Sequence, residues 1–164
     1  MKLVKICLSF LIIMGLGWAC VSQAEPVFHN AQGTAVPFKN LQNKWLIINY
    51  WASWCDSCRE EIPELNSFYK DNLDKNVVIY GVNYDQLAGS ELTADIEKVG
   101  IAFPILKEDP GRQFMLGGLD VLPITFIINP KGNVAKKIMG TITKKELIDT
   151  LKLLQAEVTH ASTT

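Results

Sequence analysis

Histidine and cysteine are scarce in this chain of 164 residues, which contains two histidines and four cysteines. The histidines, His29 and His160, stand far apart in the sequence, whereas a structural zinc site needs four clustered ligands. A c-type haem would need a histidine directly after a C-x-x-C pair, and Arg59 occupies that position. We therefore expect no metal centre and no cofactor.

Basic residues are not in excess either. The chain has 16 lysines and arginines against 17 aspartates and glutamates, which gives a net charge of −1. Proteins that bind nucleic acid usually present a strongly basic surface, so we expect no nucleic-acid partner. The sequence contains no repeat and no low-complexity block, and its length suits a single domain.

The apolar run at the N-terminus is short for a membrane span. Residues 6–21 form a run of 16 residues without a charge, against about 20 residues in a typical transmembrane helix. Two lysines precede the run, and Ser22-Gln23-Ala24 follows with small residues at its first and last positions. This pattern predicts a secretory signal peptide over residues 1–24 and one exported domain over residues 25–164. An uncleaved membrane anchor and lipid attachment at Cys20 stay open as alternatives.

Cleavage of the signal peptide would change the cysteine count of the mature chain. Cys7 and Cys20 would be removed, so Cys55 and Cys58 would be the only thiols left, and the net charge would become −3. Disulfides form and persist in exported proteins. A single pair three residues apart constrains an unfolded chain little, which favours chemistry over a stabilising role.

The two remaining cysteines lie where an apolar run ends and a helical pattern begins, in Trp51-Ala52-Ser53-Trp54-Cys55-Asp56-Ser57-Cys58-Arg59. The unpaired N–H groups and the dipole at a helix start favour a thiolate, so we expect Cys55 to be exposed and reactive. Cys58 would lie one turn inside the helix. The pattern predicts a redox-active dithiol, in which Cys55 attacks a substrate disulfide and Cys58 resolves the mixed disulfide. Trp54 is expected to be exposed and to contact the substrate.

The hydrophobic pattern predicts an α/β domain in which strands and helices alternate. The predicted strands cover residues 27–28, 35–38, 45–51, 77–82, 103–106, 121–128 and 134–138, and the first two form a hairpin. The predicted helices cover residues 60–69, 91–99, 109–116 and 143–154. Thr143 and Glu146 form a capping box at the last helix, and a polar tail follows residue 157. Three acids, Glu60, Glu61 and Glu64, are expected on the solvent face of the helix after the cysteines.

The sequence resembles the thioredoxin superfamily, and within it the periplasmic thiol:disulfide oxidoreductases of the TlpA/ResA/CcmG type. The resemblance covers nearly all of the mature chain and rests on Ile48-Asn49-Tyr50-Trp51-Ala52-Ser53-Trp54-Cys55, Cys58-Arg59, Pro63, Leu122-Pro123-Ile124-Thr125-Phe126 and Asn129-Pro130-Lys131-Gly132. It implies a thioredoxin-like three-layer sandwich with a mixed central sheet. An N-terminal hairpin and a family-type insertion within residues 77–118 would be added to that core.

The resemblance also implies roles for residues outside the cysteine motif. Pro123 would be preceded by a cis peptide bond and would face the cysteines, and the Leu122 backbone would pair with an extended substrate segment. Asn49 stands where thioredoxin has a buried acid, so this chain lacks that proton acceptor. From the residues alone we expect Asn49 to be a satisfied buried amide. Asp85, in the loop after the strand of residues 77–82, is a candidate substitute for the acid.

The residues between the cysteines, Asp56 and Ser57, bear on the direction of electron flow. A carboxylate next to Cys55 disfavours its thiolate, which favours a reductant over an oxidant. Arg59 could reverse this effect by pairing with Asp56. We accordingly predict an enzyme that reduces disulfides in exported proteins, such as apocytochrome c or another oxidoreductase.

The resemblance further implies a membrane electron donor of the DsbD or CcdA kind as a partner of this reductase. Two alternatives stay open beside the main prediction. One is a disulfide oxidase or isomerase, and the other is a non-catalytic thiol module that holds copper.

Overall fold

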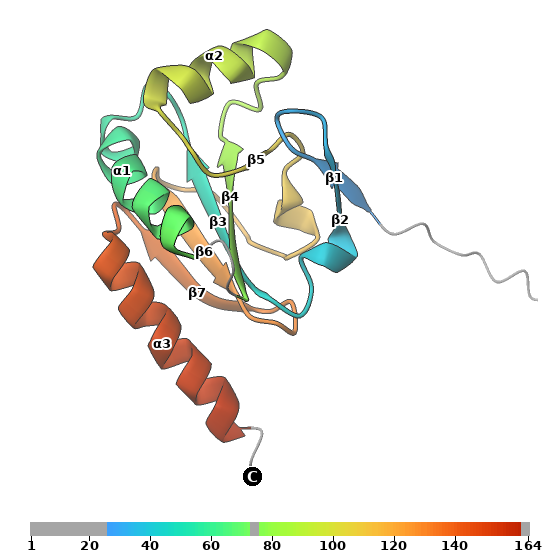
Figure 1. Cartoon of the computed structure of the whole chain (residues 1–164), viewed down its shortest axis with the longest axis vertical. Coiled ribbons are helices and arrows are strands. Elements are labelled where there is room, and N and C mark those ends of the chain that lie inside the picture. The colour runs from blue at the N-terminus through green and yellow to red at the C-terminus, as the bar shows by residue number, and fades with distance from the viewer. Residues whose placement is uncertain (1–25, 73–75, 162–164) are drawn as a thin grey trace, which may run out of the picture.

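The computed structural model describes residues 26–72 and 76–161. The predicted signal peptide lies outside the described residues. Within them, no helix has the length and apolar character needed to cross a membrane. In chain order the elements (Figure 1) are β1 (Val27–His29), β2 (Ala35–Pro37), η1 (Phe38–Asn40), β3 (Trp45–Trp51), α1 (Asp56–Asp71), β4 (Val77–Asn83), α2 (Gly89–Val99), β5 (Ile105–Leu106), η2 (Pro110–Arg112), β6 (Ile124–Ile128), β7 (Val134–Met139) and α3 (Lys144–Ala161).

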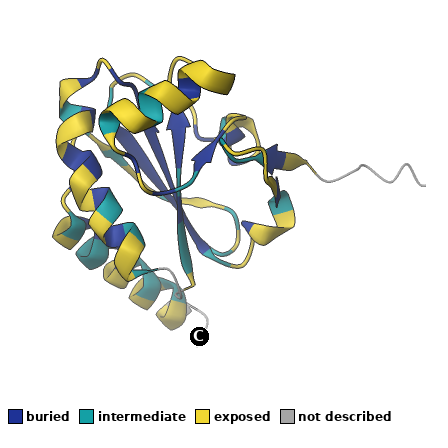
Figure 2. Cartoon of the chain, turned by 45° about the horizontal axis from the view of Figure 1, so that its top comes forward, coloured by how far each residue is buried: buried dark blue, intermediate teal, exposed yellow. Residues whose placement is uncertain are grey.

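The central strand of the main sheet is β3. The five strands lie in the order β5-β4-β3-β6-β7, with β3 parallel to β4 and antiparallel to β6. All residues of β3 are buried, and Figure 2 shows the inner strands of the sheet in the dark blue of buried residues. A continuous apolar run suits a strand that is covered on both faces. Because β3 leads directly to α1, the end of the central strand carries the cysteines.

One face of the sheet packs against helices. Ile47 and Trp51 of β3 belong to a buried cluster that includes Ile62 and Phe68 of α1 and Leu147 of α3. Successive side chains of a strand point to opposite faces, so these odd-numbered residues share one face. The apolar spacing of α1 therefore packs this helix against the central strand.

The opposite face of the sheet is covered by the N-terminal hairpin and by the segment after β5. Leu46 and Ile48 cluster there with Phe28 of β1 and with Phe114. The hairpin of β1 and β2 is antiparallel, as predicted. It is joined to the sheet edge where the Lys107 N–H donates to the His29 carbonyl oxygen at 2.8 Å. The α/β sandwich with a mixed sheet is thus confirmed.

The capping box at α3 is confirmed, but the helix is longer than predicted. The Thr143 N–H donates to Glu146 Oε2 at 2.9 Å, and the Glu146 N–H donates to Thr143 Oγ1 at 3.2 Å. The helix continues to Ala161 instead of ending near residue 154. Residues 155–157 are Gln-Ala-Glu, which are strong helix formers, so nothing in the local sequence stops the helix.

Two other predicted boundaries are wrong. The helix predicted over residues 109–116 is only the short 3-10 helix η2, because Met115 has a positive φ of 50° and the chain turns out of helical geometry. The strand predicted from residue 121 begins at Ile124. The segment before it contains the cis peptide bond between Leu122 and Pro123.

Candidate active site

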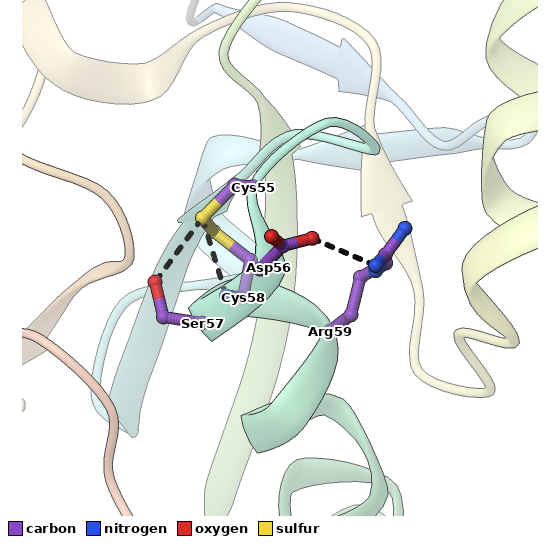
Figure 3. Close-up of polar contacts among 5 residues, drawn as sticks. All are labelled: Cys55, Asp56, Ser57, Cys58 and Arg59. Carbon is purple, nitrogen blue, oxygen red and sulfur yellow. Dashed lines mark hydrogen bonds and ion pairs between the residues drawn. A yellow bond between two sulfur atoms is a disulfide. The ribbon is translucent and has the colours of Figure 1, made fainter.

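Cys55 and Cys58 form a disulfide at the N-terminus of α1, with their Cα atoms 5.2 Å apart (Figure 3). Cys55 is the N-cap residue, and the Cys58 N–H donates to its Sγ at 3.2 Å. The Ser57 Oγ lies 3.5 Å from the same sulfur. A thiolate at Cys55 would therefore meet a backbone N–H, a hydroxyl group and the positive end of the helix dipole.

The two cysteines differ in exposure less than the sequence predicts. Cys58 is fully buried, and Cys55 is only 6% exposed. In this oxidised state the prediction of an exposed Cys55 is wrong, because the residue lies at the wall of a groove and not on an open surface. Access to its sulfur is through that groove.

Asp56 and Arg59 form an ion pair beside the disulfide. Arg59 Nη2 lies 2.7 Å from Asp56 Oδ1 (Figure 3), and the Asp56 side chain is largely exposed. The guanidinium partly balances the carboxylate that stands next to Cys55, and water screens both. The effect of Asp56 on the thiolate is therefore smaller than the sequence alone predicts.

The prediction that Glu61 lies on the solvent face of the helix is wrong. Glu61 is 2% exposed, while Glu60 and Glu64 are exposed as predicted. Its Oε1 accepts from Asn49 Nδ2 at 2.7 Å, and its Oε2 accepts from the Ile142 N–H at 3.1 Å. Burial raises the pKa of Glu61 to about 7, and these two hydrogen bonds lower it by less.

Asn49 is only partly satisfied. Its Nδ2 donates to Glu61 Oε1 and also to Thr125 Oγ1, at 3.0 Å. Its Oδ1 is buried and has no hydrogen-bond partner among the described residues. Asn49 therefore connects β3 to α1 and β6 through a buried polar cluster.

Glu61 follows Cys58 by three residues, so both side chains lie on one face of α1. The helix thus places a buried acid in hydrogen-bond contact with Asn49. Sequence reasoning missed it, although its helical spacing from Cys58 and from the buried Leu65 could have revealed it.

A groove of about 620 Å³ opens beside Cys55. One side comes from the start of α1 together with Trp54 and Tyr84, and the other comes from the segment of residues 119–122. The lining residues are Trp54, Cys55, Asp56, Ser57, Glu60, Tyr84, Leu119, Asp120, Val121 and Leu122. Its position at the reactive sulfur makes it the place where a substrate disulfide can approach. Tyr84, Leu119, Asp120 and Val121 were not singled out from the sequence, because only the fold brings their loops to Cys55.

Trp54 forms an aromatic wall of the groove together with Tyr84. Trp54 is 61% exposed, its ring meets the Tyr84 ring edge-on at 6.2 Å, and its Nε1 donates to Asp85 Oδ2 at 2.8 Å. Asp85 is exposed, and this hydrogen bond orients the Trp54 ring. The role of Asp85 as a substitute acid for Cys58 stays a prediction.

Leu122 and Pro123 stand at the far side of the groove. The peptide bond between them is cis, as the resemblance implied. Leu122 lines the groove, whereas Pro123 is buried and is not among the lining residues. Pairing of the Leu122 backbone with a substrate strand stays a prediction.

A metal site finds no support in the described part of the chain. Among residues 26–72 and 76–161, no group of three or more His, Cys, Asp or Glu side chains could hold a metal ion. The two cysteines are bonded to each other in this structure. The reactive groups of the site are therefore the two cysteine sulfurs.

Comparison with known proteins agrees with this geometry. Residues 21–137 match the AhpC/TSA family. The thiol-disulfide oxidoreductase ResA of Bacillus subtilis (strain 168) is 32% identical over 133 residues, which are 79% of this chain and 72% of that protein.

Solved structures show the same fold. StoA from Bacillus subtilis aligns with a TM-score of 0.62 at 25% identity, covering 76% of this chain and 93% of that one. A thioredoxin family thiol:disulfide interchange protein from Chlorobium tepidum TLS aligns with a TM-score of 0.67 at 24% identity, covering 79% and 92%. The resemblance to the thioredoxin superfamily is thereby confirmed.

Proposed function

This chain belongs to the AhpC/TSA family and is a thiol-disulfide oxidoreductase, and we propose that it works as a reductase of disulfide bonds in exported proteins. The observation that carries the proposal is the Cys55–Cys58 pair at the start of α1, open to a groove on the Cys55 side. The N-terminal pattern of residues 1–24 supports export.

The proposed reaction moves two electrons from the dithiol to the substrate. The Cys55 thiolate attacks one sulfur of a substrate disulfide, a mixed disulfide forms, and the first substrate thiolate leaves. The Cys58 thiolate then attacks Cys55 Sγ, the mixed disulfide breaks, and the second substrate thiolate leaves. Each leaving thiolate takes up a proton, and the Cys55–Cys58 disulfide of this structure is the product.

Glu61 is the proposed proton acceptor for Cys58. Cys58 is buried and must lose its proton before it can attack, and water does not reach it directly. A carboxylate with a pKa of about 7 is suited to accept a proton near neutral pH. Asn49 and the Ile142 N–H hold that carboxylate in place.

The proposed direction follows from charge. The groove beside Cys55 is lined by acids, and the nearby Arg59 is paired with one of them, Asp56. When the surroundings give the Cys55 thiolate only weak stabilisation, the cysteine couple is more reducing. The exported substrates would be apocytochrome c cysteines or another oxidoreductase, and a membrane donor of the DsbD or CcdA kind would restore the dithiol.

Two activity assays separate the proposed reductase from its alternatives. We expect the reduced protein to reduce insulin in the presence of dithiothreitol, and to refold scrambled ribonuclease poorly, because reduction and not isomerisation is proposed. Efficient refolding with little insulin reduction would favour an isomerase or oxidase. Stoichiometric copper binding without either activity would favour the copper-holding module.

A further inference from the structure

The groove beside Cys55 is acidic on both sides. Three of its lining residues are acids, and none of those described is a lysine, arginine or histidine. Asp56 is paired with Arg59. Glu60 on α1 and Asp120 on the opposite segment are the two acids that remain for a ligand.

Neither of these two acids is strongly neutralised. Glu60 is exposed and makes no hydrogen bond or ion pair with the described residues. Asp120 Oδ2 lies 3.9 Å from Lys137 Nζ, at the outer limit of an ion pair. Lys137 is engaged elsewhere, because its Nζ donates to the Gly118 carbonyl oxygen at 3.0 Å and lies 5.6 Å from the centre of the Phe126 ring.

The walls between the acids are apolar and aromatic. Trp54 and Tyr84 form one wall, and Val121, which is 41% exposed, belongs to the other. Long basic side chains place their methylene groups on apolar surface and keep the charged end in water, and aromatic rings attract cations. The groove therefore offers an apolar surface for the methylene groups of a lysine or arginine side chain and carboxylates for its charged end.

We propose that this groove selects disulfides flanked by a lysine or arginine of the substrate, with the basic group held between Glu60 and Asp120. The inference rests on the proposed function and names the substrate class of the same site. An acidic residue at the same place in the substrate would meet like charges, so the groove would both attract basic segments and reject acidic ones.

Three matched peptides test the inference. Each contains one disulfide and differs only in the residue next to the attacked cysteine, which is lysine, glutamine or glutamate. The second-order rate constant for reduction by the reduced full-length protein is divided by the rate constant for dithiothreitol. Because dithiothreitol, like Cys55, attacks as a thiolate but has no binding groove, this ratio removes the effect of the neighbour on the intrinsic reactivity of the disulfide.

We expect the lysine peptide to be reduced about tenfold faster than the glutamate peptide at low ionic strength, with the glutamine peptide between them. The preference should shrink to less than about twofold near 1 M salt, where the Debye length is about 3 Å. In the double variant Glu60→Gln/Asp120→Asn the preference should disappear even at low salt.

A charge-matched control separates the groove from the net charge of the protein. The double variant Glu91→Gln/Glu97→Gln removes two exposed acids from α2, which contributes no residue to the groove. It should keep the full preference for lysine.

Equal normalised rates for the three peptides with the wild-type protein would overturn the inference. A preference that survives in the groove variant, or that is lost in the α2 control, would overturn it as well. If the reduced protein reduces none of the peptides while dithiothreitol reduces all of them, the proposed reductase function fails, and the inference fails with it.

Discussion

Replacing Cys58 with alanine will stop turnover and leave the substrate covalently bound to Cys55. Cys55 lines the groove, whereas Cys58 is fully buried behind it, so only Cys55 can meet a substrate disulfide. Without Cys58 the mixed disulfide cannot be resolved from within the protein. We expect insulin reduction to fall on the order of a thousandfold and a disulfide-linked adduct to accumulate on non-reducing gels.

Cys55→Ala is the matched control for this prediction. It removes the same pair and should lose activity to the same extent, but it should form no adduct, because the remaining thiol is buried. Expression of the Cys58→Ala variant in cells would also identify natural substrates by their link to Cys55. Equal adduct formation by the two variants would contradict the assignment of Cys55 as the attacking residue.

Replacing Glu61 with glutamine will make the oxidised protein more stable at pH 8 and less active. Burial raises the pKa of Glu61 from 4.5 to about 7, so the folded chain binds this proton more tightly than the unfolded chain. The free energy of unfolding should therefore fall as the pH rises from about 4.5 to about 7, and level off above that range.

The size of this effect follows from the pKa difference. It amounts to about 3 kcal/mol at most, since one pKa unit corresponds to about 1.4 kcal/mol. Glutamine is uncharged like the protonated acid, but its amide nitrogen cannot accept one of the two hydrogen bonds that Glu61 accepts, so Glu61→Gln should match the wild type at pH 5 within about 1 kcal/mol. At pH 8 it should exceed the wild type by about 2 to 3 kcal/mol. Urea unfolding of the oxidised proteins measures both values without interference from thiol titration.

The effect of Glu61→Gln on activity is measured with the reduced protein. Loss of the proton acceptor should slow resolution of the mixed disulfide near neutral pH by about tenfold or more. Glu91→Gln, at an exposed acid of α2 outside the groove, should change neither the stability profile nor the resolution step. Parallel stability curves for wild type and Glu61→Gln between pH 5 and pH 8 would show that Glu61 is not the buried titrating group.

Local signals made much of this structure predictable from the sequence. The apolar run of β3, the cysteine pair at the following helix start and the capping box of α3 each depend on residues that are close in the chain. The cis bond before Pro123 was predicted by resemblance. These features were predictable because residues close together in the sequence determine the local structure there.

Features that depend on long-range packing were not predicted. Glu61 is an acid in a helix rich in acids, and its burial follows from Asn49 on β3 and Ile142 before α3. The acidic groove depends in the same way on Asp120, whose loop is brought to Cys55 by the fold. The short η2 helix differs from the prediction because Met115 adopts a positive φ, which side-chain periodicity does not reveal.

The equilibrium reduction potential of the Cys55–Cys58 couple tests the central claim most directly. It is measured by equilibrating the protein with glutathione or dithiothreitol mixtures of known potential and quantifying the dithiol fraction by alkylation. A reductase of exported disulfides predicts a value in the range of thioredoxin, about −270 mV. A value near that of DsbA, about −120 mV, would contradict the account, because such a couple takes electrons from substrate thiols instead of giving them.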